Sequence, residues 1–309
     1  TKTFDPSALF MKQRIIAAIA VFAMPILAIG QATMSVLDPD QTFKQGKEYI
    51  QKEQYSLAYP LFKAMYAHGI GESQIPVTVQ TEVNYYYLLC GLRLNDSTVL
   101  QQAIDYIHLE HHRPRVEMLA YHLGDYYFRM RQYNNSLKYF EKAGIAHLTN
   151  AQIADMKFKQ GYGHFYLKDF GKALPLFDVV RQLKDDPNYI DANYYYGFLQ
   201  FSEKRYDLAL PAFRIAEAGI DYRNVTAFYI TEILYFQGKK QEAIAYGEKA
   251  IKTGWQYYDL EMRQLLGHML FDQQNYEAAL PYLEEYVEKS KLTRKEDIYE
   301  LSYCYYQTK

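Results

Sequence analysis

Large and small apolar residues recur along this chain in a pattern typical of two helices that cross closely. The pattern is clearest in residues 193–220, where two of these positions precede a polar turn and four follow it. They are Tyr196, Gly197, Tyr206, Ala209, Phe213 and Ala216. Small residues are needed where two helices touch, and large ones fill the gaps on either side. The stretch therefore predicts two short helices joined by a tight turn.

The same pattern repeats with a period of about 34 residues from residue 39 to the end of the chain. The small residue of the first helix falls at Gly46, Gly91, Gly124, Gly161, Gly197, Thr231, Gly267 and Ser302. The small residue of the second helix falls at Ala58, Ala103, Ser136, Ala173, Ala209, Ala243 and Ala279. The two lie twelve residues apart in every pair, as from Gly46 to Ala58. This constant spacing predicts an all-α array of helix pairs.

Two further columns support this register. An aromatic residue precedes the second helix at Tyr55, Tyr133, Phe170, Tyr206 and Tyr276, and Lys240 departs from the rule. A proline follows the small residue of the second helix at Pro60, Pro175, Pro211 and Pro281. Because proline is tolerated in the first turn of a helix, where its missing N–H would be unbonded anyway, this column predicts where each second helix begins.

These columns resemble the tetratricopeptide repeat family over residues 39–309. The resemblance implies a right-handed α-solenoid of about seven repeats and a partial one. The chain departs from the family in places: Lys157 and Asn193 stand where a large residue is expected early in the first helix, and Glu110 replaces a small residue late in a second helix. The last repeat stops after its first helix, so we expect more protein to follow Lys309.

In this family the first helices line a concave groove that usually holds the ligand. Carried over by position, the predicted partner-binding groove consists of Tyr121, Asp125, Phe128, Phe158, Tyr162, Phe165, Tyr194, Phe198, Phe201, Phe228, Glu232 and Tyr235. Corresponding places in the outer repeats are Tyr85, His268, Phe271, Tyr299 and Tyr303. Rigid aromatic side chains suit an extended or helical peptide, a sugar ring or another subunit. A register error of one residue would rotate each helix by about 100° and turn some of these rings into the core.

Acidic residues set this groove apart from the basic grooves that bind C-terminal carboxylates in some co-chaperones of the family. Asp125 and Glu232 stand where lysine or arginine would be wanted. The formal net charge of −2 also gives no strong basic field, which argues against nucleic acid as a partner. We therefore expect protein or peptide partners of another kind.

The sequence pattern of the N-terminal region is that of an export signal rather than of a folded segment. Residues 1–10 are expected to be a non-native segment or an upstream extension. Residues 11–30 combine a positive start, an apolar run and a small-residue cleavage pattern, which is the arrangement of a signal peptide. An uncleaved anchor is the alternative, although the apolar run is short and carries Pro25. Residues 31–38 would be a short linker. The expected mature protein is periplasmic or outer-membrane-associated, is not an integral membrane protein, and is similar in style to envelope proteins of Bacteroidetes.

Candidate chemistry is sparse. One predicted helix carries a metal-compatible pair of histidines four residues apart, His108 and His112, together with Glu110 and His111. The stretch also resembles a polar helix end. No HExxH, GxSxG, P-loop or GxGxxG motif occurs. The sequence predicts no enzyme, no cofactor and no metal site.

The two cysteines, Cys90 and Cys304, lie in distant repeats and form no CxxC motif. We expect both to be buried thiols rather than a disulfide or a zinc site.

Four functions remain open from the sequence. The first is a non-enzymatic scaffold that binds a protein partner through the aromatic groove. The second is the N-terminal adaptor of a longer envelope or secretion-system protein. The third is a glycan-binding solenoid, and the fourth is an array that self-associates.

Overall fold

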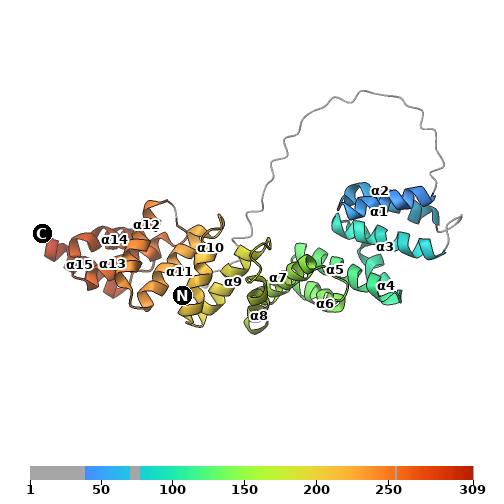
Figure 1. Ribbon diagram of the computed structural model, residues 1–309. Coiled ribbons are helices and arrows are strands. Elements are labelled where there is room, and N and C mark those ends of the chain that lie inside the picture. The colour runs from blue at the N-terminus through green and yellow to red at the C-terminus, as the bar shows by residue number, and fades with distance from the viewer. Residues whose placement is uncertain (1–38, 70–76, 255, 309) are drawn as a thin grey trace, which may run out of the picture. The chain divides into compact units, whose positions relative to one another are not determined.

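The structure is a computed structural model that describes residues 39–69, 77–254 and 256–308. Within these ranges the chain is helical and contains no strand, as the sequence predicts. It divides into two compact units, unit 1 (Thr1–Lys168) and unit 2 (Asp169–Lys309), whose helices are coloured from blue to red in Figure 1. The predicted extension, signal peptide and linker, and the single Trp255, lie outside the described residues.

The helices of unit 1 are α1 (Pro39–Gln51), α2 (Tyr55–Gly69), α3 (Val77–Arg93), the 3₁₀ turn η2 (Ser97–Val99), α4 (Leu100–Leu109), α5 (Arg113–Arg129), α6 (Tyr133–Ala143) and α7 (Asn150–Tyr166). The helices of unit 2 are α8 (Phe170–Val180), α9 (Tyr189–Ser202), α10 (Tyr206–Ala216), α11 (Arg223–Phe236), α12 (Lys240–Lys252), α13 (Asp259–Asp272), α14 (Tyr276–Lys289) and α15 (Lys295–Thr308). None of these described helices is both long and apolar enough to cross a membrane.

Small residues of the first helices lie where paired helices cross, as Gly46, Gly124, Gly197 and Gly267 do, which confirms the predicted register in these repeats. A Cβ atom on Gly124 would lie 2.6 Å from the Phe140 ring, and one on Gly267 would lie 2.6 Å from the Leu283 side chain. The small residues of the second helices are all buried. Ser136 is the one hydroxyl in that column, and its Oγ donates to the carbonyl of Gly124 at 2.9 Å.

The tight turn between paired helices depends on one residue in the left-handed region. It lies two residues before the second helix and has a φ of 57° at Arg131, 60° at Lys204 and 60° at Gln274. Gly238 takes the same place before α12, with a φ of 76°. Side chains other than glycine are strained in this region, so each such turn reduces the stability of the fold slightly.

The prolines do not mark the start of the second helices, so that prediction is wrong. Each of these helices begins five residues earlier, at the aromatic residue, and Pro60, Pro175, Pro211 and Pro281 lie in the second turn. The missing N–H leaves unbonded only a carbonyl in the exposed first turn, where water can replace the donor. All four prolines are exposed.

The first helices of neighbouring repeats lie next to one another within each unit. In unit 2, α9 contacts α11, α11 contacts α13 and α13 contacts α15, while α10, α12 and α14 pair with them as second helices (Figure 1). In unit 1, α3 contacts α5 and α5 contacts α7. Each unit is therefore a stack of helix pairs of the α-solenoid type, and one of its layers is built from the helices that carry the predicted groove residues.

Candidate functional site

The structure divides the twelve predicted groove residues into two groups of equal size. Buried are Tyr121, Asp125, Phe158, Tyr162, Phe165 and Tyr194. Partly exposed are Phe128, Phe198, Phe201, Phe228, Glu232 and Tyr235. The first group therefore belongs to the core, which corrects its sequence-based placement on an open groove.

The buried rings fill the spaces beside their own repeat. Tyr194 is only 1% exposed, and its ring stacks on Tyr222 with the centroids 4.3 Å apart. Tyr121 packs against Phe140 of the paired helix α6, at 6.1 Å. A large ring at these places fills the gap between helices. If it were left empty, the cavity would lower the stability of the fold.

The partly exposed residues of unit 2 form a single surface on the first helices. We define the α9–α11 face as Phe198, Phe201, Phe228, Glu232 and Tyr235. Beneath it lies the buried ring of Tyr229, which sequence reasoning did not single out. The rings of Phe201, Phe228 and Phe198 lie 5.0, 5.8 and 6.0 Å from that of Tyr229, each edge to face.

Edge-to-face packing on a buried ring holds the outer rings in place while part of their surface stays in water. Behind Tyr229, the ring of Phe213 on α10 stacks in parallel at 5.1 Å. The hydroxyl groups of Tyr229 and Tyr258 lie 3.2 Å apart, and burial raises the pKa of Tyr258 to about 12. The hydroxyl of Tyr258 therefore stays protonated at neutral pH.

Glu232 is the one charged side chain of the α9–α11 face. It lies on α11 one helical turn after Phe228 and about one turn before Tyr235, so the three share one side of the helix. Burial raises its pKa to about 7. Among the residues that the structure describes, none forms an ion pair or hydrogen bond with its carboxylate. Glu232 is thus a half-buried acid without a counter-ion.

Asp125 in unit 1 has the opposite surroundings. Its carboxylate is 2% exposed and pairs with Arg129 and Lys159, while Arg93 Nη1 lies 3.5 Å from Oδ2. Burial by itself would raise the pKa of Asp125, but the cations, with Lys159 foremost, hold it below its ordinary value. Asp125 therefore serves the core of unit 1, and its charge is balanced by its own chain.

The three cations around Asp125 were missed by sequence reasoning. Arg129 was within reach of it, since an aspartate and an arginine four residues apart on one helix commonly pair. Arg93 and Lys159 come from the neighbouring first helices α3 and α7, and only the stacking of repeats brings them together.

The first helices α13 and α15 of unit 2 also carry aromatic side chains at the corresponding positions. The ring of Phe271 on α13 lies 5.7 Å from that of Tyr303 and 6.5 Å from that of Tyr299, which is 62% exposed. His268, at the position of Glu232 in its own repeat, bonds to Glu300 and lies 3.0 Å from Asp297 Oδ1. Its ring is therefore held against α15 rather than turned toward a ligand.

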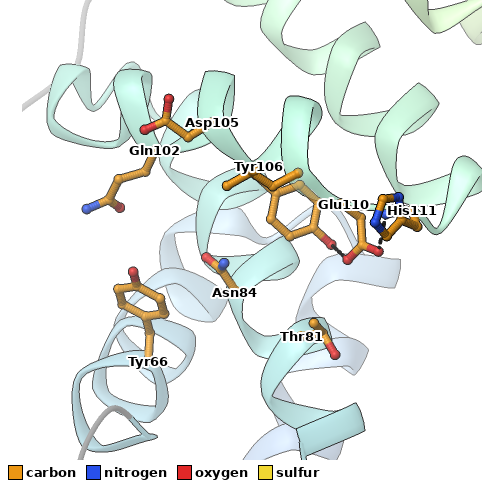
Figure 2. Close-up of a pocket in the computed structure, with 9 residues that line it drawn as sticks. Tyr66, Thr81, Asn84, Gln102, Asp105, Tyr106, Glu110 and His111 are labelled. Atoms are coloured by element: carbon orange, nitrogen blue, oxygen red, sulfur yellow. Dashed lines mark hydrogen bonds between the residues drawn. The ribbon is translucent and has the colours of Figure 1, made fainter.

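A cavity of about 440 Å³ lies in unit 1 beside α2, α3 and α4. Figure 2 shows Tyr66, Asn84, Gln102 and Asp105 among the side chains that line it. The Oδ1 atom of Asn84 is buried without a hydrogen-bond partner. Most of its lining side chains carry a polar group, and none of those named by the structure is a nucleophile with an adjacent base.

The histidines considered as metal ligands do not share a helix, because α4 ends at Leu109. Glu110 is extended, and its Oε1 accepts from the backbone N–H groups of His111 and His112 at 2.8 Å each. Its Oε2 accepts from the Tyr106 hydroxyl, a bond drawn in Figure 2. The backbone N–H of Glu110 therefore caps α4 by donating to the Tyr106 carbonyl, and its carboxylate holds the turn that leads into α5. Within the described residues, no cluster of three metal-ligating side chains occurs.

Both cysteines are free and buried, as predicted. Burial raises the pKa of the Cys90 thiol to about 12, so that side chain is not a nucleophile at neutral pH.

Two family models match parts of the chain. Family models described as tetratricopeptide repeats match residues 119–143, which include most of α5 and all of α6, and residues 232–292. No curated protein matches the chain.

Three of the similar solved structures illustrate the range of likeness. A tetratricopeptide repeat protein from Parabacteroides merdae ATCC 43184 is 12% identical with a TM-score of 0.43, over 86% of this chain and 98% of that one. The MamA 41-end structure from Desulfovibrio magneticus RS-1 is 20% identical with a TM-score of 0.45, over 56% and 93%. The apo form of RapI is 16% identical with a TM-score of 0.49, over 85% and 79%.

Proposed function

The chain is a tetratricopeptide-repeat protein, and on this premise we propose that it is a non-enzymatic scaffold that binds a protein partner through the α9–α11 face. The observation that carries the proposal is that four aromatic side chains and one acid on neighbouring first helices keep exposed surface, although the ring beneath them is buried. Exposed rings fixed by their neighbours supply contact area at a small cost in entropy, which is how aromatic residues dominate protein interfaces.

An extended or helical peptide is the partner that fits this surface best. Phe198 and Phe201 on α9 and Phe228 and Tyr235 on α11 form two adjacent pairs of rings on helices that touch. A peptide lying across the two helices places apolar side chains between the pairs and its backbone beside the tyrosine hydroxyl.

The test compares partner capture by three versions of the protein. The wild type, a Phe198→Ala and Tyr235→Ala double variant, and a Leu208→Ala control are immobilised and exposed to envelope extract. Leu208 is an exposed apolar residue on the second helix α10, away from the face. We expect a specific protein on the wild type and the control, and at least a tenfold loss on the double variant.

Circular dichroism and thermal melting of all three proteins complete the test. Phe198 and Tyr235 are preferred to Phe201, since Phe201 also packs on the buried Phe213 ring. Equal capture by the double variant and the wild type would refute binding through this face. Unfolding of the double variant would show that the rings are structural, and Phe228→Ser would then replace it in the same comparison.

We further propose that the protein acts outside the cytoplasm, because residues 11–30 have the pattern of a signal peptide. Sequencing the N-terminus of the mature protein from the natural host checks this. A start near Gln31 in an envelope fraction supports export, and an intact residue 11–30 segment in the cytoplasmic fraction contradicts it.

A further inference from the structure

Asp125 and Glu232 occupy the same position in two different repeats. Each follows directly after the small residue where the paired helices cross, which is Gly124 in one repeat and Thr231 in the other. Both are acids on a first helix, and Asp125 is buried while Glu232 is half-buried. Their surroundings therefore show what the fold supplies to a carboxylate at this position and what it leaves out.

Unit 1 supplies three cations at defined places in the repeat. Relative to the crossing glycine of its own repeat, Arg93 lies two residues after Gly91, Lys159 lies two residues before Gly161, and Arg129 lies one turn beyond Asp125. Together they hold Asp125 in its ionised form.

Unit 2 has apolar residues at all three of these places. The equivalents of Arg93, Arg129 and Lys159 around Glu232 are Leu199, Phe236 and Leu265. The neighbouring lysine, Lys240, is bonded to Asp272 Oδ2 at 2.9 Å instead. The half-buried carboxylate of Glu232 thus has no counter-ion among the described residues.

We propose that Glu232 and the rings around it form a recognition site for a basic side chain, arginine or lysine, of the bound protein partner. This inference rests on the proposed function, and it specifies the chemistry of the partner at one position. The incoming cation takes the place that Arg129 and Lys159 fill beside Asp125.

The rings flanking Glu232 suit the same ligand. Phe228 and Tyr235 stand one turn on either side of it, and Phe198 lies at the equivalent position of the preceding first helix. A cation near the faces of such rings is attracted by their π electrons, and the attraction grows as water is excluded. Lys240 already shows this contact at the rim, with its Nζ 5.8 Å from the centre of the Tyr235 ring.

Binding of a cation must be coupled to the ionisation of the acid. With a pKa of about 7, about a tenth of Glu232 is ionised at pH 6 and most of it at pH 8. The tyrosines that interact with it, Tyr206, Tyr229 and Tyr258, have raised pKa values and do not titrate in this interval. A basic ligand should therefore bind about tenfold more weakly at pH 6 than at pH 8.

The experiment titrates the full chain with three small probes: N-acetyl-arginine methylamide, the neutral N-acetyl-norleucine methylamide and the acidic N-acetyl-glutamate methylamide. Nuclear magnetic resonance follows the side-chain carboxyl carbon of Glu232. We expect saturable binding of the arginine probe, at least tenfold tighter than that of the other two. A similar affinity for the arginine and norleucine probes would overturn the proposal.

Two variants make the result specific to this acid. Glu232→Gln should bind the arginine probe at least tenfold more weakly and lose the pH dependence, and a pH dependence that persists in this variant would belong to another group. Phe236→Arg places a cation where Arg129 stands in unit 1, and it should compete with the probe while the protein stays folded. Unchanged affinity in both variants would show that the probe binds elsewhere.

The captured partner separates this inference from the function on which it rests. If Glu232→Gln captures the partner as well as the wild type does, and the ring variant does not, the scaffold function stands and the cation site is refuted. If the arginine probe binds but no protein is captured by any version, the cation site stands and the scaffold function is refuted.

Discussion

Replacing Glu232 by glutamine should make the folded protein more stable at pH 8. The pKa of this carboxyl group rises from its ordinary 4.5 to about 7 because burial disfavours the charged form. Each tenfold change in an ionisation constant corresponds to about 1.4 kcal/mol, so ionisation costs about 3 kcal/mol more in the folded protein than in the unfolded chain. Since the side chain keeps part of its contact with water, we expect about 1–2 kcal/mol of this to appear as stability.

The direction of the pH dependence follows from the raised pKa. Below pH 4.5 the acid is protonated in both states, and its burial costs nothing extra. As the pH rises from 4.5 to 7, the unfolded chain ionises first, so the wild type loses stability over this interval and the loss is complete above pH 7. Glu232→Gln has no such proton to lose, so the two proteins should be alike at pH 4.5 and differ most at pH 8.

Urea unfolding followed by circular dichroism, at constant ionic strength from pH 4.5 to 8, measures this difference. Glu277→Gln is the matched control, because Glu277 is an exposed glutamate on α14. Repeat arrays can unfold in steps, so the comparison uses the transition of unit 2 and requires equal slopes in the variants. A Glu232→Gln protein that is less stable at pH 8 would refute the reasoning, because it would show that the carboxylate makes a favourable contact.

Three further changes test other parts of the structure. Gly124→Ala should lower the free energy of unfolding by about 1–3 kcal/mol in urea titrations, since the new Cβ would lie 2.6 Å from the Phe140 ring; no change would mean that the crossing is loose. Asp125→Asn should cost about 3 kcal/mol at pH 7, because three cations lose their shared partner, and the difference should vanish in acid as the pH falls below the depressed pKa of Asp125; a pH-independent cost would point to packing instead. Lys204→Gly should raise the melting temperature, with a gain of up to about 1 kcal/mol, because the native φ of 60° is strained for lysine; a lower melting temperature would contradict that account.

The helix pairs could be predicted from sequence because close crossing is a local steric requirement. A large residue at Gly124 or Gly267 would collide with the paired helix, so glycine at a fixed spacing from a buried alanine is sufficient to set the register. The start of the second helix was less predictable. Proline at Pro175 or Pro211 fits the first turn in general, but an exposed second turn tolerates it too, and the sequence does not distinguish the two.

The exposure of the predicted groove could not be read from the repeat pattern. Tyr194 and Phe228 hold the same position in adjacent repeats, three residues before the crossing residue, yet one is buried and the other partly exposed. The difference lies in the residue that follows each helix pair. Tyr222 stacks on Tyr194 at 4.3 Å, whereas Tyr258 meets Phe228 at 4.9 Å and is tilted from it. Such contacts depend on loop geometry that a periodic pattern does not contain.

The charges could be located from sequence, but their balance could not. Asp125 and Glu232 were both expected to make the groove acidic. The first is neutralised by residues on three different helices, and the second is not. Pairing between neighbouring first helices depends on which rotamers can reach across, and this follows from the stacking of repeats rather than from spacing along one helix.

The shared position of these two acids shows that one place in the repeat can hold either a charge balanced within the chain or one without a counter-ion. The surroundings of Glu232 differ from those of Asp125 by three side chains, which are leucine, phenylalanine and leucine. The backbone around the acid need not change. Exchanging these residues with those around Asp125 would move the unsatisfied charge from unit 2 to unit 1. For a protein engineer, the proposed cation site is therefore set by three side chains beside the acid, and it can be moved to another repeat without redesigning the backbone.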